Sequence, residues 1–295
     1  MRMVKYLLAH QLDHSWGICT RSVGLQVIPP GAHFPYGEHP QKYLWERKDG
    51  RVLDEMDVLY LYQGGGWFMS AHCPRTHVQA GDVIFLFPNE WHNYAPDDDT
   101  GWEEVWVGFT GDYALRIFRE PFFSVSHPIV RIGIRPTLYS VFEKAFMIAY
   151  DERPAYQQQL AGCVLQILGS IYAYSKQVSY GDSPDTARIS AAQKFMREHA
   201  AAHIRMEDVA AHVGMGYSKF RKLFRSYTGF SPRQFFLNLK LEQSKDLLLN
   251  TRLSSKEIAF RLGYDTATYF NRIFRLHFHQ SPIEYRNSVN KVNRS

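Results

Sequence analysis

The chain has 295 residues, which is long enough for two domains that each bury their own core. Apolar residues make up 45% of it and charged residues 21%, values typical of globular domains, which excludes wholesale disorder. No apolar run approaches the length of a membrane span, and Tyr6–Ala9 is too short for a signal-peptide core. Three scattered cysteines (Cys19, Cys73 and Cys163) are typical of free thiols in a reducing compartment. We therefore expect a cytoplasmic protein with no membrane partner.

The net charge of +5 is unevenly distributed along the chain. Residues 188–295 carry 19 Lys and Arg against 8 Asp and Glu, whereas residues 1–187 carry 15 against 21. A basic half joined to an acidic half predicts that only the C-terminal half meets a polyanion. The alternative is a basic surface that is merely solvated, and charge alone does not separate the two.

The first part of the chain is predicted to be strands and turns, from about residue 24 to 111. Three β-type runs stand out at Val58–Tyr62, Val83–Phe87 and Glu104–Phe109. We expect the three glycines after Gln63 to end the first run. Short strands with turn signals between them predict a small antiparallel barrel or sandwich.

Beyond Pro136 the apolar residues recur at helical spacing in two segments. The two apolar faces consist of Leu138, Val141, Phe142, Ala145, Phe146 and Ala149, and of Leu160, Val164, Ile167, Leu168 and Ile171. The spacing predicts an antiparallel helical hairpin whose apolar stripe either pairs with a second subunit or packs on its own domain. The polar stretch Ser179–Ala187 is rich in turn formers and predicts a linker.

An internal repeat dominates the last hundred residues. The pairs Val209-Ala210 and Val213-Gly214 are matched 49 positions later by Ile258-Ala259 and Leu262-Gly263. Phe220, Phe224, Ser231 and Pro232 recur 50 positions later. Each copy predicts a short helix, a glycine turn, a longer helix and a Ser-Pro start of the next helix.

Local chemistry supports these helix boundaries. Gly214 and Gly263 suit a helix end that needs positive φ. Each Ser-Pro pair places an N-cap hydroxyl before a proline at the first helical position. Ser254 and Glu257 have the spacing of a capping box. The longer helices carry phenylalanines on one face and polar or basic groups on the other, as a helix that enters the major groove requires.

The segments VAAHVGMGYSKFRKLFRSYTGFSPRQFF and IAFRLGYDTATYFNRIFRLHFHQSPIEYR resemble the two helix-turn-helix units of the AraC family, over about Ile189–Arg286. The resemblance implies an all-α DNA-binding domain whose two recognition helices enter successive major grooves. A connecting helix at Pro232–Leu249 would hold them apart. Double-stranded DNA and RNA polymerase are the partners it implies.

Matched by position, the resemblance implies base contacts from Ser218, Arg221, Lys222, Ala267, Thr268, Asn271 and Arg272. Arg272 is the strongest candidate, because a guanidinium bridges guanine O6 and N7. Ala267 departs from relatives with a polar side chain there, so it reads a thymine methyl or nothing. Lys219, Arg225 and Arg275 are interpreted as phosphate contacts, with solvated surface as the alternative for the two arginines.

The N-terminal motifs GDVIFLFPNEWHNY (81–94) and GWEEVWVGFTG (101–111), with GRVLDEMDVLYLYQGGGWF upstream, resemble the cupin-like sensor domains of the same family. The resemblance implies an antiparallel β barrel of the cupin-like jelly-roll type, with a small-molecule effector inside. We therefore place a ligand-binding domain at 1–135, a helical hairpin at 136–177, a linker at 178–187 and the DNA-binding domain at 188–295.

Cupin enzymes usually hold a metal with a His-x-His pair, a Glu and a later histidine. His92 matches the later histidine, but no His-x-His lies upstream. His72, Cys73 and His77 form a loose alternative cluster. We expect no metal, no cofactor and no enzyme, and we interpret His92 either as a structural histidine at a strand end or as a ligand contact.

Sugars are held by stacking on aromatic rings and by hydrogen bonds from charged or amide groups. Carried over from arabinose-responsive relatives, the ligand contacts fall on Tyr94, Glu104 and Trp106, with an arginine from the earlier strand region. Glu104 departs from a histidine in those relatives, so the ligand need not be arabinose. The remaining candidates are Arg51, Trp45 and Trp67, of which Trp67 is better explained by core packing and Arg51 has a surface ion pair with Asp54 or Glu55 as its alternative.

The sequence thus predicts a homodimeric transcription regulator that activates carbohydrate-use genes in response to a sugar. One alternative is a metal-dependent cupin enzyme fused to a DNA-binding domain. Another is a ligand-independent DNA-binding protein, against which the two base-reading faces argue.

Overall fold

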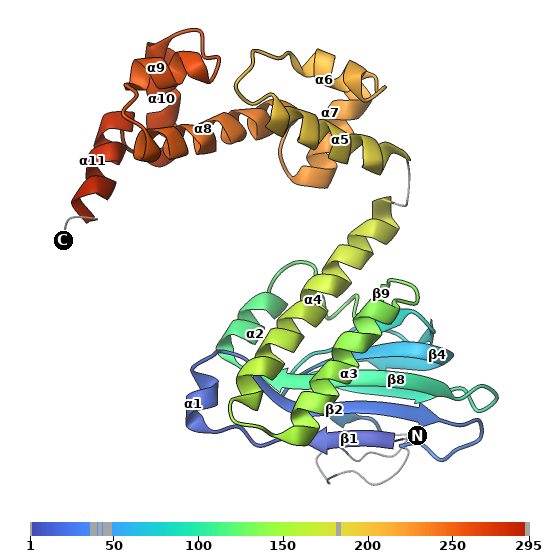
Figure 1. Ribbon diagram of the computed structural model, residues 1–295. Helices are drawn as coiled ribbons and strands as arrows, with labels where there is room; N and C mark the ends of the chain where they lie inside the picture. Colours follow the sequence, from blue (N-terminus) through green and yellow to red (C-terminus); the bar gives the residue numbers. More distant parts are fainter. Residues whose placement is uncertain (1, 36–39, 41–42, 44–48, 181–183, 293–295) are drawn as a thin grey trace. The chain divides into compact units, whose positions relative to one another are not determined.

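The structure is a computed structural model that describes residues 2–35, 40, 43, 49–180 and 184–292. The chain divides into two units, Met1–Ser179 and Tyr180–Ser295, and each has its own hydrophobic core (Figure 1). No helix in the described part of the chain is both long and apolar enough to cross a membrane.

The first unit is built on antiparallel strands, as the sequence predicted. Their bounds are β1 Arg2–Tyr6, β2 Cys19–Ile28, β3 Arg51–Val52, β4 Met56–Ser70, β5 Thr76–Gln79, β6 Asp82–Leu86, β7 Trp91–Pro96, β8 Trp102–Thr110 and β9 Ile129–Arg131. Hydrogen bonding runs in the order β1-β2-β8-β4-β6-β9 in a first sheet, and β3-β7-β4-β5 in a second. The long strand β4 belongs to both sheets and joins them.

The prediction that glycines 64–66 end a strand was wrong. Strand β4 continues through them, and the bulge between Leu61 and Gln63 lies where it passes from one sheet to the other. Two of the glycines allow very close backbone contacts: a Cβ on Gly64 would lie 2.1 Å from the Gly101 carbonyl oxygen, and one on Gly66 would lie 2.2 Å from that of Ala95. The glycines therefore bend the strand without ending it.

The helices of the first unit, among its described residues, are α1 Gln11–His14, α2 Asp112–Phe118, α3 Pro136–Asp151 and α4 Tyr156–Tyr180. The helices α3 and α4 form the predicted hairpin and lie across one face of the first sheet (Figure 1). Their two predicted apolar stripes are buried in one core with that sheet. These stripes therefore pack on their own domain and are not available to a second subunit.

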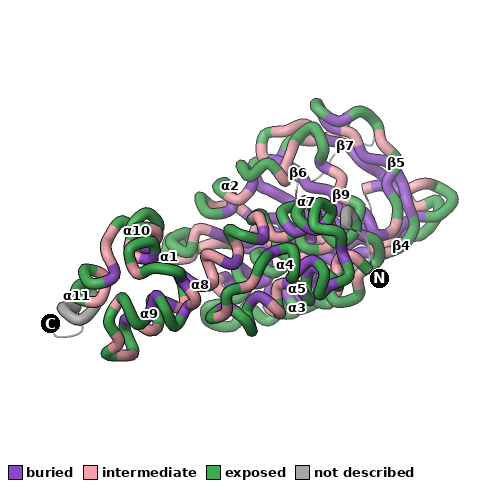
Figure 2. Tube along the Cα trace, turned by 90° about the horizontal axis from the view of Figure 1, so that it is seen from above, coloured by how far each residue is buried: buried purple, intermediate pink, exposed green. Residues whose placement is uncertain are grey.

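Alternation along the strands of the first sheet gives it two different faces. In β8, Val105 and Val107 face the helices, whereas Glu104 and Trp106 face the second sheet. The same alternation operates in β2 and β4. The strands are largely buried, as Figure 2 shows for β4, β6 and β7. The layers are thus helices, first sheet and second sheet, and the candidate ligand residues lie between the two sheets.

The second unit is all helical, with bounds α5 Pro184–Glu198, α6 Met206–His212, α7 Tyr217–Thr228, α8 Pro232–Asn250, α9 Ser255–Arg261, α10 Ala267–Phe278 and α11 Pro282–Val292. Most of the predicted linker at 178–187 is helical, because α4 reaches Tyr180 and α5 begins at Pro184. Ser231 caps α8 with its hydroxyl, the capping box at Ser254 is present, and Gly214 and Gly263 both have φ of +65°. These local predictions are confirmed.

Candidate functional site

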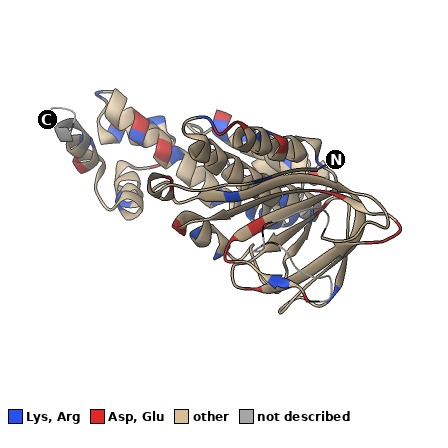
Figure 3. Ribbon diagram, turned by 90° about the horizontal axis from the view of Figure 1, so that it is seen from below, with Lys and Arg blue, Asp and Glu red and all other residues tan. Residues whose placement is uncertain are grey.

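Helices α7 and α10 each follow a short helix and a glycine turn, which is the arrangement of a recognition helix. Each is anchored by two fully buried phenylalanines, Phe220 and Phe224 in α7 and Phe270 and Phe274 in α10. This fixes the opposite face of each helix toward solvent. Figure 3 shows Lys and Arg along the helices of this unit.

In α7 the predicted base-facing residues Ser218, Arg221 and Lys222 are all exposed, as is Arg225. Lys219 is different: its Nζ lies 2.6 Å from an Asp185 carboxylate oxygen of α5. The ion pair ties the first turn of the recognition helix to the start of α5 and competes with the phosphate contact predicted for Lys219.

In α10 the side chains of Thr268, Arg272 and Arg275 are exposed. The Arg272 guanidinium lies 5.5 Å from the centre of the Tyr269 ring, which restricts its range. Asn271 is half-buried, and its Oδ1 has no hydrogen-bond partner among the described residues. Ala267 packs against the core of the second helix-turn-helix unit, which limits what its methyl group can reach.

The second candidate site is a small cavity between the two sheets of the first unit. Its wall includes four of the predicted ligand residues, namely Arg51, Tyr94, Glu104 and Trp106. The other described residues of the wall were not predicted from the sequence, and they are Tyr6, Ser22, Gln26, Phe34, Pro35, Tyr43, Asp57, Leu59 and Leu86. The cavity volume is about 30 Å³, which is room for about two waters.

A hydrogen-bond network holds Arg51 in this wall. Its guanidinium donates from Nε to His92 Nε2 at 3.2 Å, from one terminal nitrogen to the Tyr43 carbonyl at 2.9 Å, and from the other to the Tyr94 hydroxyl at 2.8 Å. These contacts hold the Arg51 side chain in the cavity wall. From β3, the Arg51 side chain therefore reaches His92 and Tyr94 on the neighbouring strand β7.

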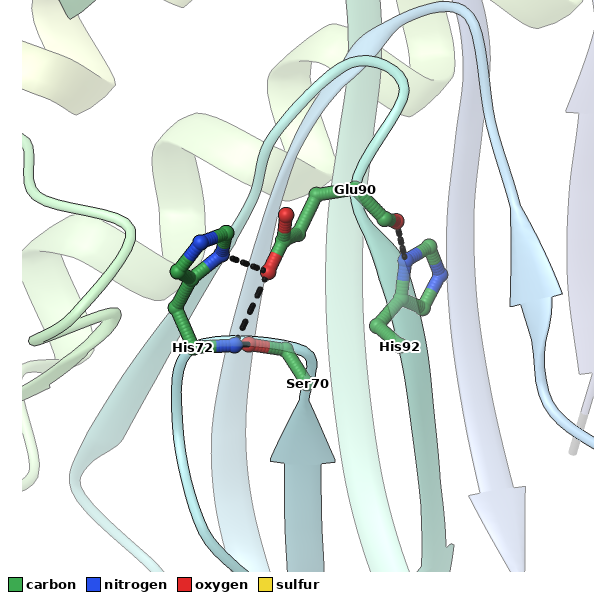
Figure 4. Close-up of polar contacts among 4 residues, drawn as sticks. All are labelled: Ser70, His72, Glu90 and His92. Atoms are coloured by element: carbon green, nitrogen blue, oxygen red, sulfur yellow. Dashed lines mark hydrogen bonds and ion pairs between the residues drawn. The ribbon is translucent and has the colours of Figure 1, made fainter.

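His92 lies behind Arg51 and does not line the cavity. Because Nε2 accepts from Arg51, the ring proton sits on Nδ1, which donates to the Glu90 carbonyl at 3.0 Å (Figure 4). Burial and the Arg51 charge lower the pKa of His92 to about 3, so the ring is neutral. A direct ligand contact does not fit this position, and the side chain instead orients Arg51.

The outer end of this network is a carboxylate that joins two turns. One oxygen of Glu90 lies 2.8 Å from His72 Nδ1 and accepts from the His72 backbone N–H at 3.1 Å (Figure 4). That N–H also lies 3.2 Å from the Ser70 hydroxyl. The contacts fix the turn after β4 to the turn before β7, which carries His92.

Glu104 is a buried carboxylate in the wall of the cavity. Its side chain is 4% exposed, and its Oε2 has no hydrogen-bond partner in the described part of the chain. Burial raises the pKa of Glu104 to about 8, against the opposing effect of the Arg51 charge. A ligand group that donates to this oxygen would remove the cost of leaving it unpaired.

Trp106 and Gly24 face each other across the β2–β8 pair. A Cβ on Gly24 would lie 2.1 Å from the Trp106 ring, so the glycine makes room for the indole in the cavity wall. Ser22 and Gln26 lie two positions either side of Gly24 on the same face of β2. The polar residues at alternate positions of this largely apolar strand show that Ser22 and Gln26 share a face, but not that this face encloses the cavity.

Two other tryptophans complete the comparison with the predicted ligand residues. Trp45 lies outside the described residues. Trp67 is 9% exposed and packs in the core between the sheets, with the Arg75 guanidinium 4.3 Å from its ring centre. The interpretation of Trp67 as a core residue fits this position.

The alternative metal cluster is dispersed. His72 contacts Glu90, His77 lies 3.5 Å from Asp97, and Cys73 is buried in the core. Within the described ranges, no group of three or more His, Cys, Asp or Glu side chains is placed to hold a metal ion.

Comparison with known proteins supports both halves of the chain. Residues 32–171 match the AraC-like ligand binding domain, and residues 209–288 match a helix-turn-helix domain. On the folds described above, these matches define a DNA-binding transcription regulator with a ligand-binding domain. The chain belongs to the AraC family.

Relatives match across both units. The MmsAB operon regulatory protein of Pseudomonas aeruginosa is 27% identical, covering 83% of this chain and 77% of the relative. The raffinose operon transcriptional regulatory protein RafR of Pediococcus pentosaceus is 22% identical (82% and 88%), and the lactose operon transcription activator of Staphylococcus xylosus is 25% identical (79% and 84%). These relatives and both families are transcription regulators and not enzymes.

Among solved structures, the DNA-binding domain of AdpA in complex with a target DNA is similar at 28% identity. The match has a TM-score of 0.33 and covers 34% of this chain and 90% of that one.

Proposed function

We propose that the chain is a cytoplasmic, homodimeric activator of carbohydrate-use genes that responds to a sugar bound between the two sheets of its first unit. The observation that carries the sugar assignment is the unpaired Oε2 of Glu104 beside the aromatic walls of Tyr94 and Trp106. A sugar ring offers hydroxyl donors at its edge and C–H groups on its faces, which suit such a wall. The names of the raffinose and lactose operon regulators support the same ligand class.

The cavity of about 30 Å³ is far smaller than the pocket of roughly 300 Å³ or more that small ligands usually occupy. A sugar therefore binds only if wall residues move, so it stabilises an expanded sensor over the closed one. Such a differential affinity is what shifts a protein between two states. In this proposal the expanded sensor favours the arrangement that recruits RNA polymerase.

For DNA recognition we propose base contacts from Ser218, Arg221, Lys222, Ala267, Thr268, Asn271 and Arg272, and phosphate contacts from Arg225 and Arg275. The exposure of most of these side chains on α7 and α10 supports the assignment. Lys219 would join the phosphate contacts only if it leaves Asp185.

We place the dimer contact on the outer side of the hairpin 136–177. Its inner stripes are already buried, but Leu165 and Tyr172 of α4 remain 41% and 46% exposed. Sedimentation of the Leu165→Asp variant should show a loss of dimer if this face pairs two subunits. An unchanged dimer would exclude this face.

The test of the sensor is a thermal-shift screen of the full chain against pentoses, hexoses and short oligosaccharides. A ligand that binds the native state raises the melting temperature with concentration. We expect the shift to vanish in Trp106→Ala and Glu104→Ala. The control is Trp91→Ala, because Trp91 donates to the Asp49 carbonyl and does not line the cavity. A shift that survives both cavity variants would place the site elsewhere, and no shift with any sugar would refute the carbohydrate assignment.

A further inference from the structure

The turn of the second helix-turn-helix unit lies against a loop that precedes the first. Gly263, at the end of α9, approaches the loop between α5 and α6. A Cβ on Gly263 would lie 2.9 Å from the Ala201 carbonyl oxygen and 3.2 Å from the Ala202 carbonyl carbon. Next to it, His203 Nδ1 lies 3.9 Å from an Asp265 carboxylate oxygen. The two units are thus in contact at a point other than the connecting helix α8.

The equivalent glycine of the first helix-turn-helix unit, Gly214, has no such contact. Gly214 has the same φ of +65°, but a Cβ there would meet nothing within 4 Å. Glycine at 214 therefore satisfies only the backbone conformation of the turn, whereas glycine at 263 satisfies the same conformation and a close approach to the other unit.

Lys240 of α8 lies directly beneath this contact. Its side chain is buried, and its Nζ donates to the Gly263 carbonyl at 3.3 Å. The ammonium is 4.9 Å from the centre of the Phe236 ring and 5.4 Å from that of Tyr264. Phe236 belongs to the core of the first helix-turn-helix unit and Tyr264 to the core of the second, so Lys240 bridges the two cores.

A cation in such a place has a cost. Burial lowers the pKa of Lys240, with the Asp265 charge opposing it. Taking an ammonium out of water is unfavourable unless hydrogen bonds and ring contacts compensate. A leucine or methionine would fill the same space without that cost. The hydrogen bond to the turn carbonyl is the contact that only the lysine makes.

We propose that Lys240 and Gly263 are positioning residues that lock the two helix-turn-helix units at one relative orientation, so that the protein reads two DNA segments at one fixed spacing. The helix α8 spans 19 residues and fixes how far apart the units lie. It does not by itself fix how each unit is turned about the helix axis. The contact among Lys240, the Gly263 turn and the loop at Ala201 removes that freedom.

The experiment measures spacing discrimination. A duplex is selected from a random pool by the full-length wild-type protein, and its two protected segments are located by footprinting. One base pair is then inserted or removed between them, which turns one segment by about 35° relative to the other. We expect the wild type to lose at least about tenfold in affinity for either altered duplex, because one recognition helix loses its base contacts.

Lys240→Met keeps an unbranched side chain that is one atom shorter, and it removes the ammonium and its hydrogen bond to Gly263. We expect this variant to bind the selected duplex about tenfold more weakly than the wild type does. Its affinity for the altered duplexes should be less than about threefold below its own affinity for the selected duplex. Circular dichroism at the assay temperature shows whether the variant is folded. A folded Lys240→Met protein with wild-type spacing discrimination would overturn the proposal.

Gly263→Ala and Gly214→Ala form a matched pair, because both place alanine at φ of +65° and only the first meets the other unit. Both variants should lower the melting temperature of the helical domain Tyr180–Ser295. Only Gly263→Ala should lose spacing discrimination, whereas Gly214→Ala should keep it. Equal loss in the two variants would show that turn strain, and not the contact between units, sets the spacing. If Gly263→Ala does not fold, Lys240→Met decides.

Discussion

Replacing Glu104 with glutamine removes the ionisable group of the sensor cavity while keeping the size of the side chain and one oxygen acceptor. Burial raises the pKa of Glu104 to about 8 in the folded protein, from an ordinary value of 4.5. Because the folded-state pKa is the higher one, the folded protein keeps a proton that the unfolded chain releases. The free energy of unfolding therefore falls as the pH rises from 4.5 toward 8 and changes little above that.

The magnitude follows from the two pKa values. At 1.36 kcal/mol per pKa unit, the full effect has an upper limit of about 5 kcal/mol, of which about 2 kcal/mol falls between pH 6 and pH 8. His92 acts in the opposite direction near pH 6, because its folded-state pKa of about 3 leaves only the unfolded chain to take up a proton there. The difference between the wild type and Glu104→Gln cancels this second effect.

Tryptophan fluorescence isolates the unit concerned, because all six tryptophans lie within Met1–Ser179. Urea unfolding of the full chain at pH 6, 7 and 8 gives the free energy of unfolding of this unit. We expect the wild type to lose about 2 kcal/mol relative to Glu104→Gln across this range. Glu120→Gln, at an exposed position of the same unit, should follow the wild type. Parallel pH profiles for the wild type and Glu104→Gln would refute the reasoning.

Three further outcomes are expected. Gly24→Val should lower the free energy of unfolding by about 1–3 kcal/mol in the same fluorescence assay, because its side chain would overlap the Trp106 ring, and an unchanged value would mean that the indole can leave the cavity at no cost. Arg272→Ala should weaken specific DNA binding by about 1–3 kcal/mol in an isotherm at fixed salt, while non-specific binding changes little; no specific loss would remove Arg272 from the base contacts. Asp185→Asn should release Lys219 to a phosphate and steepen the salt dependence of DNA binding by about one counterion, and an identical slope would mean that Lys219 stays off the DNA.

Much of the sensor fold follows from local patterns in the sequence. The runs at Val58–Tyr62, Val83–Phe87 and Glu104–Phe109 fall within or almost within β4, β6 and β8, because alternating and β-branched residues mark a pleated, buried surface. Strand β1 at Arg2–Tyr6 was missed, since a short edge strand is defined by its pairing with β2 and carries little pattern of its own. The prediction that glycines 64–66 end a strand failed for a similar reason. These glycines allow close contact with backbone that is distant in the sequence, and the local pattern does not show such contacts.

The candidate ligand site could be predicted in part. Tyr94 and Glu104 lie in motifs that mark strands, and the fold brings them together with Arg51. Gln26 and Asp57 could not be assigned, because alternation tells which residues share a face but not which face encloses the cavity. For His92 the sequence left a structural role and a ligand contact both open, because its partner Arg51 is 41 residues away and only the β3–β7 pairing brings the two together.

The internal repeat shows where symmetry in a sequence stops being informative. It correctly equates Gly214 with Gly263, because both must supply a left-handed residue at the end of a short helix. It is silent on the loop at Ala201, which approaches only the second glycine. Two equivalent positions thus have one local requirement in common, and one of them has a second requirement set by the arrangement of the two units. Lys240 depends on the same arrangement. Its buried ammonium is compensated by the hydrogen bond that it donates to the Gly263 carbonyl, and only the packing of the two helix-turn-helix units brings these groups together.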